Sequence, residues 1–191
     1  MLPGGSSKLV TRWMVVTIAA SLIAAVDGGW LAHWASLSPS RVLHGEVWRL
    51  ATWPLVHTAP LSLLFTCAAI YKFGGELAPR WGDKRLLRFM LQIVIVASAT
   101  TCVVAAITGG VYMRRLGGWA ATDVLVIAWA RQFPERSLVL YGLVTLRGQE
   151  LVRVTLATAI VFAVFLGPVV MAPELAACVA TAWYPRGWLR K

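Results

Sequence analysis

Six apolar runs follow one another along the chain, and they restrict the folds that are open to it. The runs cover residues 13–37, 61–77, 87–107, 117–130, 151–169 and 171–184. A helix needs about 20 consecutive apolar residues to cross a hydrocarbon core of about 30 Å. Lipid offers no hydrogen bonds to the backbone, so each run must satisfy its own N–H and C=O groups as a helix. We therefore predict an all-α integral membrane protein whose single domain, residues 1–191, is a bundle of six transmembrane helices.

The fourth and sixth runs are shorter than the others, with 14 residues each. We predict that they lie in the centre of the bundle, where longer helices shield them from lipid. Both carry small residues at four-residue spacing, Gly117 and Ala121 in one run and Ala172, Ala176 and Ala180 in the other. Small residues let membrane helices approach closely. The two short helices are therefore expected to touch.

The distribution of basic residues predicts the orientation. The chain is 59% hydrophobic and has a formal net charge of +10, but its basic residues flank the apolar runs, so we expect the lipid bilayer as partner and no nucleic acid. With six spans, 14 of the 18 Lys and Arg residues fall on one side, and the other side holds Arg41, Arg49, Arg114 and Arg115. Both termini, residues 1–12 and 185–191, are then predicted to be cytoplasmic. We expect the cytoplasmic membrane of a bacterium.

Cysteine and histidine residues are too scattered along the chain to predict a cofactor, a metal or a disulfide. They are Cys67, Cys102, Cys178, His33, His44 and His57. The first run continues past Asp27 without a small-residue cleavage site, so we expect a retained span and no cleaved signal peptide.

Residues 38–66 separate the first two runs and are too polar to cross a membrane. They are also amphipathic, which predicts a partly embedded external loop. We expect Trp48 and Trp53 to lie at the level of the lipid headgroups. Arg49 is expected to reach outward to lipid phosphates or to bind carbonyl groups of the loop. These three residues are the predicted loop anchor.

Several motifs in this part of the chain resemble those of the rhomboid intramembrane proteases. They are Trp48, Arg49, Thr52 and His57 before the second run, then Gly74 and Gly75, and the segment RWGDKRLLRF at 80–89. The resemblance extends from about Gly45 to the sixth run. It implies a six-span rhomboid-like bundle with an interfacial first loop, cytoplasmic termini, and short fourth and sixth helices.

The residues at the rhomboid catalytic positions do not fit the rhomboid reaction. The resemblance places the nucleophilic serine at Ala120 and the histidine base at Glu174. The groups that hold the oxyanion fall on Ser62 and Thr66, and only an earlier loop histidine has a counterpart, His57. Serine hydrolysis needs a nucleophile and a base. The chain therefore resembles an inactive branch, the rhomboid pseudoproteases such as derlins and iRhoms, and is not expected to be an enzyme.

Asp123 interrupts the fourth apolar run, one helical turn after Ala120 and on nearly the same face. An unpaired carboxylate at that depth costs at least a few kcal/mol. Asp123 is therefore expected to share a proton with Glu174 or to accept a hydrogen bond, for example from Thr101, whether or not it has a function. Glu174 follows Pro173, where it could equally cap a helix.

The resemblance implies a membrane protein that binds transmembrane segments of client proteins and influences their stability or trafficking, as in protein quality control. The predicted client cavity is lined by Asp123, Glu174, Trp119, Thr122 and His57. Two alternatives stay open: an intramembrane protease that uses Thr122 or an Asp123–Glu174 acid pair, and a small proton- or ion-coupled transporter that uses Asp123. The basic loop after the fourth run is expected to lie on lipid headgroups or to dock a soluble cytoplasmic partner. A homo-oligomer is also open.

Overall fold

Helices make up most of the chain in the computed structural model, which describes residues 7–110, 112–140, 144–167 and 170–184. The first half contains α1 (Lys8–Val26), α2 (Trp30–Ala35), α3 (Pro39–Leu43), α4 (Arg49–Thr52), the short 3-10 helix η1 (Trp53–Leu55), α5 (Pro60–Ala69), the π-helical turn η2 (Ile70–Gly74) and α6 (Gly75–Trp81). The second half contains α7 (Asp83–Thr108), α8 (Trp119–Gln132), strands β1 (Ser137–Leu140) and β2 (Val144–Arg147), α9 (Gly148–Leu166) and α10 (Ala172–Trp183).

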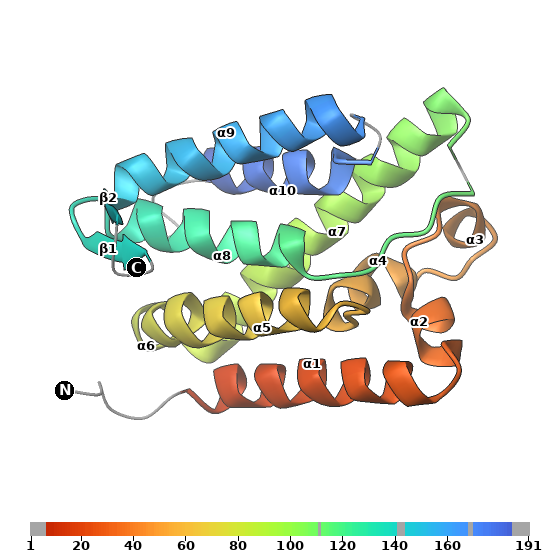
Figure 1. The fold of residues 1–191 in the computed structure, drawn as a ribbon, viewed down its shortest axis with the longest axis horizontal. Coiled ribbons are helices and arrows are strands. Elements are labelled where there is room, and N and C mark those ends of the chain that lie inside the picture. Colours follow the sequence, from red (N-terminus) through yellow and green to blue (C-terminus); the bar gives the residue numbers. More distant parts are fainter. Residues whose placement is uncertain (1–6, 111, 141–143, 168–169, 185–191) are drawn as a thin grey trace.

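The long helices run between two ends of the molecule (Figure 1). Helices α1, α5, α8, α9 and α10 lie in roughly one direction, and α7 crosses them obliquely. Helices α2, α3 and α4 gather at one end, beside the segment that leads from α7 into α8, and the β1–β2 hairpin lies at the other end. Helix α8 lies between α5 and α9, so the chain places the predicted site helix inside the bundle.

Four helical stretches within the described residues are long and apolar enough to span a membrane. They are Lys8–Val26, Pro60–Trp81, Asp83–Thr108 and Gly148–Leu166. Helices α8 and α10 have only 14 and 12 residues, which corresponds to about 21 and 18 Å at 1.5 Å per residue. The prediction that these two helices are short is confirmed, whereas six full crossings stay a prediction.

Helix α8 is the central helix, as expected. Eight of its 14 residues are buried, against three of 19 in α9. Helix α10 packs against both α7 and α8, which confirms that the two short helices touch. Where α8, α9 and α10 meet, Ile127, Ala159 and Cys178 form a small buried cluster. Ala121, from the predicted small-residue stripe, instead lines a pocket toward α1 and α7.

The first apolar run is not one helix, contrary to the predicted span 13–37. Helix α1 ends at Val26, and α2 begins after a turn in which Gly28 and Gly29 have φ of 73° and 85°. Glycine adopts such left-handed angles without steric strain. The Asp27 carboxylate accepts hydrogen bonds from the N–H groups of Gly29 and Leu31, both at 2.8 Å. Asp27 therefore stabilises the turn and the start of α2, and the first span ends earlier than hydropathy suggested.

The segment after α8 forms an antiparallel hairpin, although only a loop was expected there. Ser137 pairs with Arg147 at its open end. Gly148 follows directly and begins α9, which passes very close to the end of α8. A Cβ atom on Gly148 would lie 2.6 Å from the Phe133 carbonyl oxygen and 2.8 Å from that of Ala130. This contact fixes the angle at which the chain leaves the hairpin.

We expect Gly148→Ala to lower the free energy of unfolding by about 2 kcal/mol, the usual effect of overpacking. The added methyl group would overlap backbone carbonyls, which cannot rotate away as a side chain can. Gly75→Ala is the matched control, because its Cβ would meet no atom within 4 Å. That variant should be as stable as the wild type, or more stable by up to about 1 kcal/mol. Unfolding by dodecyl sulfate in mixed micelles measures both, and equal losses would contradict the close contact.

Candidate functional site

Arg49 is buried, with 1% of its surface exposed. Its Nε donates to Glu46 Oε2 at 2.6 Å, and its Nη1 donates to the carbonyl oxygens of His33 at 2.7 Å and Ser36 at 2.8 Å. The side chain thus holds α2 and α4 together through loop carbonyls. Arg49 does not reach outward to lipid phosphates, the other partner considered for it, because the polar groups that match its guanidinium lie inside the loop.

The two predicted anchor tryptophans have different environments. Trp48 is 39% exposed and stacks on Trp34 with ring centroids 5.6 Å apart. Trp53 is 1% exposed, and its Nε1 donates a hydrogen bond to Ser98 Oγ at 2.8 Å. Trp53 therefore fastens the loop to α7 from inside the bundle, and its indole N–H binds a hydroxyl of the protein in place of a lipid headgroup.

The two positions that the rhomboid resemblance predicts for the nucleophile and the base carry a methyl group and an ion-paired carboxylate. Ala120 and Glu174 are 2% and 5% exposed. Arg115 Nη2 donates to Glu174 Oε1 at 2.7 Å. The Arg115 backbone exchanges two hydrogen bonds of 2.9 Å with Leu37, which ties the segment before α8 to the first loop. Glu174 Oε2 and Arg115 Nε are buried without a hydrogen-bond partner in the described residues.

Asp123 lines a cavity of about 530 Å³ between α8, α9 and α10. Trp119, Thr155, Thr158, Phe162 and Glu174 also line it. Within the described ranges, Asp123 has no hydrogen bond or ion pair. The suggested donor Thr101 instead donates to the Ala97 carbonyl at 2.7 Å. The cavity therefore presents the unpaired Asp123 carboxyl group beside the Arg115–Glu174 ion pair, and the rest of its lining is mostly apolar.

Thr122 and His57, which were predicted to line the client cavity, belong to a different polar cluster. Thr122 Oγ1 lies 3.2 Å from Thr66 Oγ1, and His57 Nδ1 lies 2.9 Å from Ser62 Oγ. Adjacent residues of an α-helix point about 100° apart, so Thr122 and its neighbour Asp123 lie on different faces of α8. The sequence placed Thr122 and Asp123 in one cavity, whereas α8 directs these two side chains to separate sites.

Gly118 lies against this second cluster at the start of α8. A Cβ atom there would lie 2.9 Å from Thr66 Cγ2 and 3.0 Å from His57 Nε2. His57 is 4% exposed, and its Nε2 has no hydrogen-bond partner in the described part of the chain. Burial lowers the pKa of His57, because the imidazolium form loses its hydration. The imidazole is therefore a weak base in this position.

One known protein family matches almost the whole chain. A family model described as "Eukaryotic integral membrane protein (DUF1751)" matches residues 8–189. The chain belongs to this family. No curated protein matches it. As a DUF1751 protein it is an integral membrane protein, and the eukaryotic description does not fit the bacterial membrane that we expected.

Sequence reasoning about this DUF1751 protein missed Arg115 as the partner of Glu174. One signal was available, since a carboxylate in an apolar helix requires a cation or a donor, and Arg115 is one of only four basic residues on the predicted external side. No three His, Cys, Asp or Glu side chains in the described ranges lie close enough together to hold a metal ion.

Proposed function

We propose that this protein is a rhomboid-like pseudoprotease with six spans and cytoplasmic termini, which binds transmembrane segments of client proteins and influences their stability or trafficking. Helices α8 and α10 serve as its fourth and sixth spans. The membership in an integral membrane family and the short, central α8 are consistent with this proposal.

The surroundings of Ala120 and Glu174 support a role without proteolysis. The Ala120 methyl group cannot attack a carbonyl carbon, and the Glu174 carboxylate is engaged by Arg115 at 2.7 Å. A general base must be within hydrogen-bond reach of the nucleophile that it activates. At the two positions that match the rhomboid dyad, there is no hydroxyl group to activate, and the carboxylate that could act as a base is bound by Arg115.

Client binding is inferred from the cavity that contains Asp123. Its carboxyl group has no partner among the described residues, and its surroundings include Val154, Ala159 and Phe162. An unpaired carboxyl group inside a membrane bundle is unfavourable. A client helix with a hydrogen-bond donor or a basic side chain at that depth would satisfy it, whereas a wholly apolar helix would not.

This proposal predicts selective binding of polar transmembrane helices. A leucine–alanine helix with one central lysine should bind the purified protein in liposomes about fivefold more tightly than the same helix without lysine, a difference typical of one interhelical polar contact. Energy transfer between labelled helix and labelled protein measures the affinity. Asp123→Leu should remove the preference, and Thr158→Trp, which fills the cavity, should weaken binding of both helices.

Two matched variants serve as controls. Glu135→Gln removes a negative charge outside the cavity, and Ala157→Trp adds the same bulk to an exposed position of α9 that does not line it. Both should bind the lysine helix as the wild type does. Equal affinity of the two helices for the wild type, or a preference that survives Asp123→Leu, would contradict client recognition by this cavity.

A second candidate function rests on the Ser62–His57 pair. A hydroxyl 2.9 Å from an imidazole is the arrangement that a serine hydrolase requires. The lowered pKa of His57 argues against a hydrolase, because the ring is a weaker base. In addition, Nε2 has no partner in the described residues that would orient the ring or stabilise the imidazolium form. Cleavage of the model helix by the wild type, abolished in Ser62→Ala, would establish a hydrolase in place of the pseudoprotease.

A further inference from the structure

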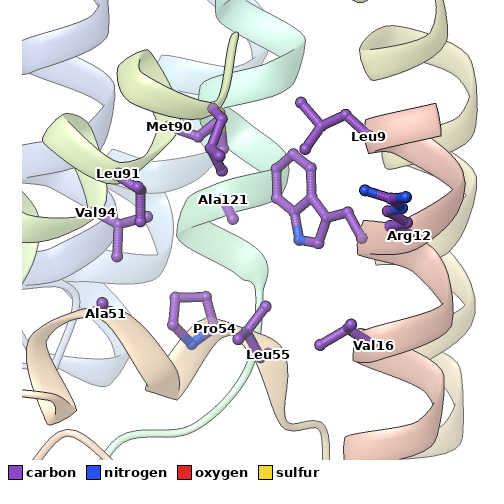
Figure 2. Close-up of a pocket in the computed structure, with 12 residues that line it drawn as sticks. Leu9, Arg12, Val16, Ala51, Pro54, Leu55, Met90, Leu91, Val94 and Ala121 are labelled. Carbon is purple, nitrogen blue, oxygen red and sulfur yellow. The ribbon is translucent and has the colours of Figure 1, made fainter. Parts of the chain in front are cut away.

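A second cavity, of about 290 Å³, lies between α1 and α7 and is distinct from the one that contains Asp123. Figure 2 shows Leu9, Arg12 and Val16 of α1 on one side, facing Met90, Leu91 and Val94 of α7 on the other. Pro54 and Leu55 of η1 close its far end, and Ala121 of α8 lies behind.

The walls of this pocket are apolar except for Arg12. An apolar cavity of about 150 Å³ inside a protein excludes water and holds a molecule the size of benzene. The α1–α7 pocket is larger and lies between two helices that are long and apolar enough to span a membrane. Its occupant is therefore expected to be hydrocarbon, and the bilayer supplies it.

Arg12 lines one end of the pocket, and two further basic residues lie near the starts of the same two helices. Arg12 and Lys8 are exposed near the beginning of α1, and Lys84 is exposed near the beginning of α7. Lys84 precedes Leu87 and Leu91 by three and seven residues, which places it on the face of α7 that lines the pocket. The Leu9 N–H group donates to Asp83 Oδ2 at 3.3 Å, so the two helix starts lie side by side.

The charge of Arg12 is available to a ligand. The ion pairs among the described residues involve Arg41, Arg49, Lys72, Arg115 and Arg136, and none involves Arg12. Asp83, the acidic residue nearest in sequence to Lys84, already accepts hydrogen bonds from Ser7 Oγ and the Leu9 N–H group. Lys8, Arg12 and Lys84 outnumber this one carboxylate, so the charge here stays positive and an anion is its complement.

We propose that the pocket binds one anionic phospholipid, with an acyl chain between α1 and α7 and its phosphate at Arg12, assisted by Lys8 and Lys84. The apolar walls select the chain, and the cluster of cations selects the charge of the headgroup. Basic pockets between transmembrane helices bind anionic headgroups in this way. The site does not depend on client binding, because Ala121 and Asp123, which line the two cavities, point about 200° apart on α8.

Native mass spectrometry of the purified protein with added lipid tests this proposal. Phosphatidylglycerol and phosphatidylcholine with identical acyl chains are the probes. The wild type should retain one phosphatidylglycerol in preference to phosphatidylcholine. Arg12→Gln should lower the preference about fivefold, the effect expected of one basic residue at an anionic headgroup. Leu91→Trp, which fills the pocket and keeps every charge, should abolish retention of both lipids.

Matched variants distinguish lipid binding in the pocket from lipid binding to the rest of the basic surface. Val15→Trp adds the same bulk at an exposed position of α1 outside the pocket, and Arg88→Gln removes a cation of α7 that lies toward Tyr184. Both should retain phosphatidylglycerol as the wild type does. The proposal is overturned if the wild type shows no preference, or if the preference survives in Leu91→Trp, since the basic surface alone would then account for it.

Discussion

Replacing Arg49 by methionine is expected to lower the free energy of unfolding by about 3 kcal/mol, because each buried acceptor left without its donor costs about 1 to 3 kcal/mol. Methionine keeps much of the apolar volume but leaves Glu46 Oε2 and the carbonyl oxygens of His33 and Ser36 without their donor. Arg49→Lys should recover only part of the loss, because an ammonium group cannot reach three acceptors with the fixed fork of a guanidinium. Unfolding in mixed micelles measures the three proteins.

Arg41→Met is the matched control for this prediction. Arg41 also pairs with Glu46, at 3.3 Å, but its side chain is 42% exposed. Exposed pairs contribute little, so a change within about 0.5 kcal/mol is expected. If Arg49→Met were as stable as Arg41→Met, the inward position of Arg49 would be contradicted.

Acid titration gives a further readout of the same contact. The hydrogen bond from Arg49 holds the pKa of Glu46 below its ordinary value. A carboxyl group whose pKa is lower in the folded state stabilises the fold above its unfolded pKa, and this contribution is lost as the pH falls through the folded pKa. As the pH falls, the free energy of unfolding should therefore decrease less in Arg49→Met than in the wild type.

Hydropathy predicted the helices well because the bilayer restricts the backbone so strongly. The long stretches α7 and α9 lie close to the predicted runs 87–107 and 151–169, and the short α8 and α10 lie close to 117–130 and 171–184. The break at Asp27 escaped prediction because a carboxylate that binds the start of α2 and two glycines change the backbone path without changing the mean hydropathy. The β1–β2 hairpin escaped because its short strands carry little periodic signal.

Side-chain partners were harder to predict than helices. For Arg49 the sequence left lipid phosphates and loop carbonyls as equal partners, since the carbonyls that bind it come together only when α2 and α4 fold against each other. Asp123 and Thr122 were assigned to one cavity because they are neighbours in sequence. The site that each face of α8 serves depends on the packing of α5 and α9, which no local pattern encodes.

Arg115→Met is expected to lower the free energy of unfolding by about 3 to 4 kcal/mol, because it leaves the buried Glu174 carboxylate without a cation. Glu174 is 5% exposed, and its Oε2 already has no hydrogen-bond partner in the described residues, so little else can compensate. Glu174→Gln should lose less, about 1 to 2 kcal/mol, since the remaining Arg115 is half-buried and the amide can still accept its hydrogen bond. Thermal and dodecyl sulfate unfolding measure both variants.

Arg114→Met is the control, because Arg114 donates to His33 Nδ1 at the surface and a change within about 0.5 kcal/mol is expected. The double variant Arg115→Met/Glu174→Met tests whether the loss in Arg115→Met comes from the unpaired charge of Glu174. Replacing both partners of a buried ion pair by apolar residues is often neutral, so the double variant should be more stable than Arg115→Met alone. A double variant whose loss equals the sum of the losses of Arg115→Met and Glu174→Met, each measured alone, would mean that Arg115 and Glu174 act independently. Their 2.7 Å contact would then not be what holds the segment before α8 against α10.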